Sequence, residues 1–349
     1  MKKRMLISIN SLGSNSVGIS LVNLLTRLDY SKYDVDLVFA NASGNLVNMI
    51  PKSVNIVLSP FTNKKLGFFE KLKYFKRYDF SLMYDVGNVE LSKFTIRCSR
   101  NSAIYLHKNY RSIYSAGHNY DKFILNYKIF EFDKFVFPNK ELMNLFTNIH
   151  PDALDRSYVL EYLVNDKYII NASKASIEVD KPNYKTLLLT AGTLNDRAKN
   201  YTLMIKMMSN LVKINNHVEL WILGDGPDLV NLKMLVNELK LSNYVKFFGF
   251  KVNPYPYMSI ADYFINTADS FDSSTAIIEA KVLEKPILST GTEIVDENIH
   301  VISADVNKIH LDVNEIISKR IKYKGVNNFW VINQKSLNEL NEIISKGKK

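Results

Sequence analysis

Short apolar runs alternate with helical patterns along most of the chain. Residues 5–10 form an apolar run that predicts a buried strand. Apolar residues at helical spacing predict a helix over 19–28, and residues 35–40 predict a second buried strand. Strand–helix–strand alternation of this kind predicts a parallel sheet that helices cover on both faces.

The alternation blurs between about residues 151 and 183, where polar and charged residues dominate, and then restarts. We therefore predict an N-terminal domain over 1–165, a linker over 166–184, a second domain over 185–330, and a C-terminal helix over 331–349 that packs back on the first domain. In the second domain the expected strands are 185–192, 218–224, 244–249, 262–267 and 286–290, and the expected helices are 201–213, 228–241 and 274–284.

The fold class that follows is α/β, with two tandem Rossmann-like domains, each a doubly wound parallel sheet. In such sheets, ligands bind beyond the carboxyl ends of the strands. If the two domains face one another, the cleft between them is the expected binding site.

Composition places the chain among ordinary globular proteins. It has 349 residues, of which 46% are apolar and 23% charged, enough for a sizeable core. Cys98 is the only cysteine, which excludes an intramolecular disulfide, a thiolate zinc cluster and an iron–sulfur site. No run approaches 18 apolar residues, and the basic start is interrupted too early for a signal peptide, so we expect a cytoplasmic protein.

The formal net charge of +10 is compatible with anionic partners. Residues 64–77 carry six basic residues against Glu70, with aromatic residues between them. Such a segment is typical of a helix on an anionic membrane surface, here the cytoplasmic face of the inner membrane, or of a solvated helix whose apolar stripe joins the core. No recognised module supports nucleic acid as a partner.

A glycine-containing loop, residues 13–18, follows the first strand. Its sequence lacks the G-x-G-x-x-G fingerprint, which argues against a nicotinamide dehydrogenase. The loop still precedes a helix, whose first N–H groups are unpaired. We expect either an anion site that includes Gly13 or an ordinary polar turn.

The loop after the first strand of the second domain, residues 192–200, holds two cations. Arg197 and Lys199 come just before a helix, where positive charge is unfavourable to the helix dipole. A bound anion such as a diphosphate would compensate for this, and a solvated surface is the alternative.

Two further loops and one helix start add candidates. Gly224 and Gly226 flank an aspartate in a tight turn that lets the backbone approach a ligand. Phe250 follows a later strand, and Ser and Thr residues gather at the start of the helix that contains Glu279. A carboxylate on an apolar helix face needs donors, which ribose hydroxyls or a buried ion pair would provide.

Together these segments resemble a known family. Residues 192–200, 224–227, 245–249 and 269–287 are similar in order and spacing to the donor-binding half of glycosyltransferase family 4. Residues 105–110 resemble the strand-end histidine segment of its acceptor half. The resemblance implies the GT-B fold, with the two domains facing a cleft, and retaining transfer of a sugar from a nucleotide donor without a cofactor or required metal.

The resemblance also implies roles for individual residues. Lys199 would hold the diphosphate, Glu279 would bind the ribose, and His107 would lie near the donor sugar. These three are the candidate catalytic residues, and the leaving phosphate would help to deprotonate the acceptor, so that no protein nucleophile is needed. The candidate donor-binding residues are Gly13, Thr193, Arg197, Gly224, Gly226, Phe250, Asp272, Ser273, Ser274, Thr275 and Ala276.

Two departures from the family pattern leave alternatives open. Thr193 stands where the family has Arg, although Arg197 could supply that charge, and Phe271 stands where the first of two paired glutamates is expected, with Asp272 beside it. We expect a transferase that uses a UDP-sugar to extend a capsule or related surface polysaccharide on a glycan or lipid-linked acceptor. A catalytically silent subunit that stabilises a partner transferase and a sugar-nucleotide epimerase are the alternatives.

Other patterns carry no chemistry. Asp34 and Asp36 match the D-x-D of metal-dependent sugar transferases, but they belong to residues 33–39, the start of the second expected strand. The histidines lack metal-ligand spacing, and Trp221 is expected in the core.

Overall fold

The chain forms two compact units in the computed structural model. The first comprises Met1–Val164 with Phe329–Lys349, and the second comprises Asn165–Asn328. The structure describes residues 2–13, 16–41, 44, 46–57, 77–108, 110, 114, 118–268, 275–291, 297–325 and 328–346. The basic segment 64–77 lies, except for Arg77, outside these residues. Along the described part of the chain, no helix combines the length and apolar character that crossing a bilayer requires.

The first unit is built on a parallel sheet that has seven strands among the described residues, in the order β3-β2-β1-β4-β5-β6-β7. Strand β1 is central and pairs with β2 on one side and β4 on the other. The strands are β1 Lys3–Ile9, β2 Tyr33–Phe39, β3 Val54–Val57, β4 Phe80–Met83, β5 Ser102–Tyr105, β6 Lys134–Phe137 and β7 Ser157–Val159.

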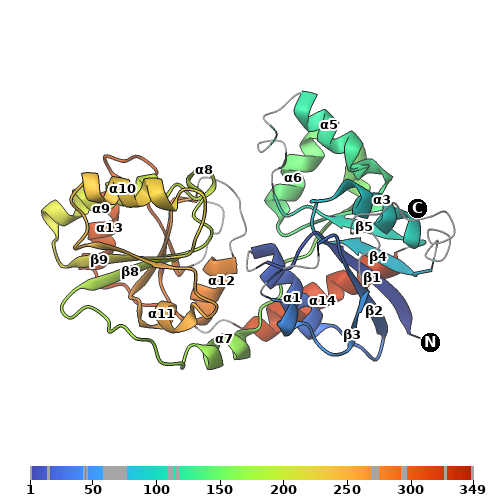
Figure 1. Ribbon diagram of the computed structural model, residues 1–349, viewed down its shortest axis with the longest axis horizontal. Coiled ribbons are helices and arrows are strands. Elements are labelled where there is room, and N and C mark those ends of the chain that lie inside the picture. The colour runs from blue at the N-terminus through green and yellow to red at the C-terminus, as the bar shows by residue number, and fades with distance from the viewer. Residues whose placement is uncertain are drawn as a thin grey trace. The chain divides into compact units, whose positions relative to one another are not determined.

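Helices cover both faces of this sheet. Figure 1 shows α1 and α14 on one side of the strands and α3 on the other, where Phe94 of α3 packs with Leu6 and Val38. The helices are α1 Ser16–Arg27, α3 Val89–Cys98, α5 His118–Asn126, α6 Lys140–Ile149 and α14 Phe329–Ser345, with short 3-10 turns η1 Val47–Met49, η2 Ile129–Glu131 and η3 Pro151–Arg156.

The second unit has the same organisation, with six parallel strands among its described residues in the order β10-β9-β8-β11-β12-β13. These are β8 Thr186–Ala191, β9 Val218–Leu223, β10 Val245–Gly249, β11 Tyr263–Asn266, β12 Ile287–Ser289 and β13 Ile299–Val301. Helices α9 Tyr201–Ile214, α10 Leu229–Glu238 and α13 Ile309–Ser318 pack together on one face, and α7 Asp166–Ala172, α11 Tyr255–Ile260 and α12 Thr275–Val282 on the other (Figure 1).

The sequence signal for these elements has a simple physical origin. Strands covered on both faces read as continuous apolar runs, and Leu187, Leu188 and Leu189 of β8 are fully buried. Helix starts are fixed by caps: the side chains of Asn139 and Asn200 accept hydrogen bonds from backbone N–H groups three residues later. The α/β class with two doubly wound sheets is thus confirmed.

The polar stretch expected as a linker is in part a helix of the second unit. Helix α7 occupies residues 166–172 of the expected linker 166–184, and Asn165 caps it by accepting from the N–H of Tyr168. Its C-terminal carbonyl, on Ala172, accepts from Asn253 Nδ2 at 2.8 Å. Seven residues with one fully buried side chain, Ile169, are too few for the helical period to stand out in the sequence.

Helix α14 belongs to the first unit through polar contacts at both ends. The side chain of Asn333 is buried and accepts from the N–H of Val164 at 2.8 Å while donating to its carbonyl at 2.9 Å. Near the other end, Lys134 Nζ donates to the carbonyls of Ile343 and Lys346. The last helix therefore folds back onto the sheet that begins the chain.

Replacing Asn333 by alanine should destabilise the first unit. The substitution leaves the Val164 N–H without its partner in a buried position, which costs about 1–3 kcal/mol. Urea unfolding followed by circular dichroism measures this, with Asn338→Ala on the exposed face of the same helix as the matched control, expected within about 0.5 kcal/mol of the wild type. Equal stability of the two variants would contradict a structural role for the Asn333–Val164 pair.

Candidate functional site

The order of strands reverses around β8 in the second unit. Strands β9 and β10 lie on one side of β8 and β11 to β13 on the other, so the loops that follow β8 and β11 diverge at the carboxyl edge of the sheet. Such a topological switch point is where doubly wound sheets bind ligands. The two candidates Lys199 and Arg197 follow β8, and the Ser/Thr-rich segment follows β11.

One buried threonine joins these two connections. Thr267, directly after β11, is fully buried, and its hydroxyl donates to the carbonyls of Lys199 and Asn200, each at 3.0 Å. Because both acceptors are backbone atoms, this contact fixes the turn that carries Lys199 against the end of β11. Lys199 is thereby placed at the switch point.

The turn itself is held from its other side. Helix α8, Asp196–Lys199, ends at Asn200, whose backbone has a left-handed φ of 52°. The Asp196 carboxylate accepts from both the N–H and the hydroxyl of Thr202, each at 2.6 Å, and the Asp196 N–H donates to Asp228 at 2.8 Å. Lys199 is half-buried and Arg197 is exposed, and both belong to a turn whose backbone these hydrogen bonds hold.

The glycines of the second unit lie where two backbone segments approach each other closely. A Cβ atom on Gly224, whose φ is +138°, would lie 1.8 Å from the carbonyl oxygen of Gly192, and one on Gly226 would lie 2.5 Å from the carbonyl oxygen of Leu194. The loops after β8 and β9 are also joined by a hydrogen bond from the Leu194 N–H to the Asp225 carbonyl, 3.0 Å. Their backbones therefore approach each other closely, and no ligand is needed to explain glycine at 224 and 226.

Glycines in and near the glycine loop of the first unit also lie against backbone. A Cβ atom on Gly18 would lie 2.0 Å from the Gly13 carbonyl oxygen, and one on Gly44 would lie 1.9 Å from that of Leu12. Glycine at 18 and 44 is required by packing between backbone segments. Gly13 itself is a partner in that contact.

Helix α12 contributes a buried carboxyl group. Thr275 and Ala276 are buried at its start, and Glu279, one turn on, is 6% exposed. The Tyr255 hydroxyl donates to Glu279 Oε1 at 3.2 Å, and within the described ranges no cation pairs with this carboxylate. We expected ribose hydroxyls or a buried cation as the donors, and the structure instead shows the hydroxyl of Tyr255, so the expectation of ribose hydroxyls stays a prediction. Asp272, Ser273 and Ser274, like Phe271, lie outside the described residues.

Burial sets the protonation of Glu279. Removal from water disfavours the charged form and raises the pKa of Glu279 from 4.5 to about 7, and the hydrogen bond from Tyr255 opposes this only in part. Burial also raises the pKa of Tyr255, and the neighbouring Glu279 carboxylate raises it further. A ligand that donated further hydrogen bonds to Glu279 would stabilise its charged form.

Thr193 and Phe250 are placed differently from Lys199. Thr193 is exposed on the loop after β8 and offers a neutral hydroxyl where the family pattern has a cation. Phe250 is 42% exposed after β10, and β9 separates β10 from β8. The structure thus puts Thr193 on the same loop as Lys199 and sets Phe250 further along the edge of the sheet.

His107 lies in the core of the first unit rather than on its surface. It is 1% exposed, and its Nε2 lies 2.6 Å from the carbonyl oxygen of Tyr84. Since a carbonyl only accepts, Nε2 carries the proton and Nδ1 accepts from the Tyr162 hydroxyl, 2.7 Å away. Burial lowers the pKa of His107 to about 3, so the ring is neutral. Neither nitrogen is left for a sugar in this structure, and His107 instead orders a stack with Tyr105.

The remaining sequence patterns are structural where the chain is described. Asp36 accepts from the hydroxyl of Tyr78 at 2.6 Å and from Asn55 at 2.8 Å, so it is a partner of neighbouring polar groups. Trp221 is confirmed in the core, and its Nε1 donates to the buried Glu219 at 2.7 Å. Among the described residues, no cluster of three or more His, Cys, Asp or Glu side chains could hold a metal ion.

Sequence reasoning missed Thr267 and Tyr255. Each acts through one hydroxyl whose partner lies 24 or more residues away. A lone Thr at the end of a strand and a lone Tyr in a short helix carry no pattern, and only the tertiary contact reveals them.

Substituting Gly224 by alanine should disrupt the carboxyl edge of the second unit. The new Cβ would collide with the Gly192 carbonyl, in addition to about 1–2 kcal/mol for a left-handed alanine. Gly249→Ala is the matched control, because φ is +68° there and no atom lies within 4 Å of the added Cβ. Thermal unfolding should show a clearly larger loss for Gly224→Ala, and equal losses would contradict the backbone contact.

The buried carboxyl of Glu279 should make stability depend on pH. The pKa of Glu279 is higher in the folded than in the unfolded protein. Its contribution to the free energy of unfolding is therefore fully present below about pH 4.5 and is lost as the pH rises through about 7. Glu279→Gln should therefore gain stability relative to the wild type between pH 5 and pH 8, by up to about 3 kcal/mol. Unfolding midpoints across this range measure the effect, and Glu238→Gln, an exposed carboxylate on α10, controls for loss of one charge. Parallel curves for Glu279→Gln and wild type would refute the assignment.

Known proteins resemble this chain in both sequence and fold. Residues 173–324 match the model of the family described as glycosyl transferases group 1. The lipopolysaccharide core biosynthesis glycosyltransferase LpsE of Rhizobium meliloti is 27% identical over 116 residues, which is 33% of this chain and 33% of that protein.

A second relative matches over more of the chain. The N-acetylgalactosamine-N,N'-diacetylbacillosaminyl-diphospho-undecaprenol 4-alpha-N-acetylgalactosaminyltransferase of Campylobacter jejuni is 27% identical over 197 residues, 55% of this chain and 49% of that protein. The matched part of the chain thus spans a third to a half of the length of these two curated relatives.

The fold is shared with solved structures at low sequence identity. Anabaena Alr3699/HepE, crystallised with UDP and glucose, superposes with a TM-score of 0.75 at 15% identity, covering 97% of this chain and 100% of that one. The two units therefore have the GT-B fold. Residues 173–324 are similar to the family described as glycosyl transferases group 1.

Proposed function

We propose that the chain is a retaining glycosyltransferase that takes a sugar from a nucleotide donor, which we expect to be a UDP-sugar, bound by its second unit. The observation that carries this proposal is the Thr267 hydroxyl, which holds the backbone of Lys199 and Asn200 at the topological switch point. The family domain covers this same unit, and the structurally similar HepE was crystallised with UDP.

In this proposal, the second unit stabilises the departing nucleoside diphosphate. The Lys199 ammonium and the exposed Arg197 supply positive charge to the diphosphate, and the N-terminus of α12, which follows β11, adds the positive end of a helix dipole. Charge that develops on the leaving oxygen is met by groups that are already in place, because the turn is fixed by Thr267 and Thr202. Arg197 supplies the positive charge that the family pattern has at the place where this chain has Thr193.

Glu279 binds the sugar of the nucleotide. Its carboxylate has one protein donor, Tyr255, and further lone pairs for the ribose hydroxyls. The leaving phosphate accepts the proton of the acceptor hydroxyl on the same face of the donor sugar, so no protein nucleophile enters the reaction. His107 has no part in proton transfer, since both of its nitrogens are engaged within the core.

The acceptor belongs to bacterial surface polysaccharide synthesis in this proposal. One relative is named for lipopolysaccharide core biosynthesis and another for a sugar attached to diphospho-undecaprenol. A glycan or lipid-linked glycan at the cytoplasmic face of the inner membrane fits both names. Residues 64–77, with their basic and aromatic side chains, would dock the chain on that surface.

A catalytically silent subunit is the second candidate. It is favoured by Thr193, an exposed neutral side chain at the position of the family's arginine. Such a subunit would fold and pair with a partner transferase without turning over a donor of its own.

Nucleotide binding tests the proposal. Thermal unfolding with UDP, GDP, ADP and their sugar conjugates should show one nucleotide that stabilises the protein, by about 2.7 kcal/mol at ~100 Kd. Lys199→Ala should weaken that nucleotide at least about tenfold, because a charge-assisted hydrogen bond is lost. Lys206→Ala, an exposed lysine on α9, is the control and should bind as the wild type does.

Two results would overturn the assignment. Equal weakening in Lys199→Ala and Lys206→Ala would show a general charge effect rather than a site. The absence of stabilisation by any nucleotide would favour the silent subunit, which co-purification with a partner transferase would then establish.

A further inference from the structure

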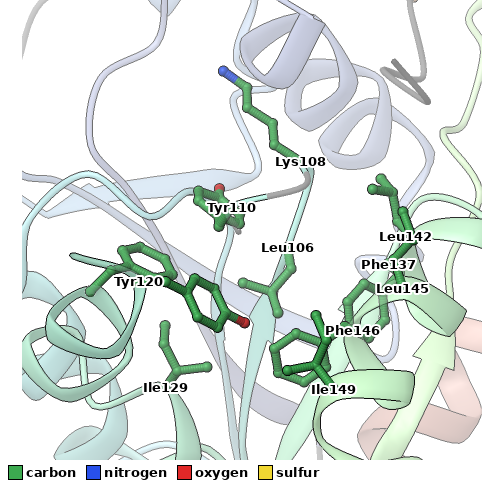
Figure 2. A pocket seen from close by; sticks show the side chains of 11 residues that line it. Leu106, Lys108, Tyr110, Tyr120, Ile129, Phe137, Leu142, Leu145, Phe146 and Ile149 are labelled. Carbon is green, nitrogen blue, oxygen red and sulfur yellow. The ribbon is translucent and has the colours of Figure 1, made fainter. Parts of the chain in front are cut away.

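Polar groups in the two units differ in how far the protein already engages them. In the first unit, Figure 2 shows the pocket between α5 and α6, with the ammonium of Lys108 directed away from it. The hydroxyl of Tyr120, which also lines this pocket, is hydrogen-bonded to His150 Nε2 at 3.0 Å. In the second unit the buried Glu279 carboxylate keeps unused hydrogen-bonding capacity, so the residues that hold it determine what it can bind.

The hydroxyl of Tyr255 fixes one end of this carboxylate. Both side chains are buried, and the hydroxyl oxygen lies 3.2 Å from Glu279 Oε1. An ionised carboxylate only accepts hydrogen bonds, so the hydroxyl is the donor. Within the described ranges it is the one donor to this carboxylate, which leaves Oε2 and the remaining lone pair of Oε1 for a ligand.

Helix α7 holds Tyr255 in place. The ring of Tyr168, on α7, meets the ring of Tyr255 edge to face, with the centroids 6.1 Å apart and the planes at 88°. The side chain of Asn253 ties the start of α11 to the same helix, because its Nδ2 donates to the Ala172 carbonyl at 2.8 Å while its Oδ1 accepts from the Tyr255 N–H at 3.3 Å. The ring and the backbone of Tyr255 are therefore both fixed by contacts outside α12.

Burial and Tyr255 together control the protonation of Glu279. Helix α12 packs on α7, α11, β11 and β12, and the charged residues on these five elements are Asp166, Lys167 and Lys281. The tyrosines on α7, α11 and β11 are neutral near pH 7. The pKa of Glu279 is raised by burial and lowered by the hydrogen bond from Tyr255, and not by any of these charges.

We propose that Tyr255 is a positioning residue for ribose recognition: it orients Glu279 so that Oε2 and the free lone pair of Oε1 accept the 2′- and 3′-hydroxyls of the nucleotide. Two hydroxyls on adjacent ring carbons need two acceptor sites close together, which an ionised carboxylate held in one orientation provides. The hydrogen bond from Tyr255 favours both the charge and the orientation. This inference rests on the proposed function, which puts the ribose at Glu279.

Binding of UDP and of 2′,3′-dideoxy-UDP to the full chain tests this inference. The UDP preference is the ratio of the two affinities, and in the wild type at pH 7 it should be at least about tenfold, because the analogue leaves the carboxylate without its hydroxyl donors. Tyr255→Phe should reduce the UDP preference to below about threefold and leave the affinity for the analogue within about twofold.

The matched control makes the same change on the same helix. Tyr257 is buried on α11, where its ring packs against Trp221 and Phe248. Tyr257→Phe removes a hydroxyl without touching the Glu279 contact, so it should keep the UDP preference of the wild type.

The pH dependence of the UDP preference separates positioning from packing. Both nucleotides carry the same phosphates, so their ionisation cancels in the ratio, and the preference of the wild type should rise as Glu279 ionises through about pH 7. In Tyr255→Phe the lost hydrogen bond raises the pKa of Glu279 further, so the rise should move to higher pH. A packing defect alone would lower the preference without moving its pH dependence.

A measurement without nucleotide keeps the contact separate from the proposed function. The stabilisation gained from Glu279→Gln should grow with pH up to about 7 in the wild-type background, and up to a higher pH in the Tyr255→Phe background. Unfolding midpoints across the pH range measure this, and they also show whether each variant is folded.

Three results would overturn the inference. An unchanged UDP preference in folded Tyr255→Phe would do so while leaving the proposed function standing. An equal loss of preference in Tyr255→Phe and Tyr257→Phe would show a general loosening of α11. If neither nucleotide binds the wild type and the shift in the unfolding midpoints is still present, the proposed function fails and ribose recognition fails with it, although the contact between Tyr255 and Glu279 stands.

Discussion

The close approach of two backbones at the carboxyl edge of the second sheet sets the geometry on which its candidate site depends. The loops after β8 and β9 meet where Gly224 packs against Gly192 and Gly226 against Leu194. A Cβ atom on Gly224 or Gly226 would collide with the backbone of the other loop. With these loops in contact, the chain after β8 turns directly into α8 and brings Lys199 to the end of β11. Thr267 then fixes it there.

Burial assigns different roles to the two titratable groups singled out in the two units. Glu279 is buried with one donor, so its pKa rises toward neutrality and its remaining lone pairs can receive hydroxyls. Burial lowers the pKa of His107, although its hydrogen bond to the Tyr84 carbonyl opposes this, and both ring nitrogens already have protein partners. The difference lies in unsatisfied hydrogen-bonding capacity, which decides whether a buried polar group is a site or a part of the core.

The two units divide the chemistry of the proposed reaction between them. The second unit offers fixed cations and a buried carboxyl, which suit a nucleoside diphosphate and its ribose. The first unit is the acceptor side in this proposal, as the resemblance of residues 105–110 to the family's acceptor half implies. The glycine loop of the first unit, by contrast, is explained by contacts between its own backbone segments.

The sequence by itself determined the α/β class, the strand and helix order and the position of Lys199 after β8, because apolar runs, helical spacing and Asn caps are local signals. It also indicated that Glu279 lies on a buried face. The tertiary structure alone decided that α7 interrupts the expected linker, that Gly224 and Gly226 pack against backbone, and that His107 has no free nitrogen. Each of these depends on a partner distant along the chain, and neither periodicity nor composition records such partners.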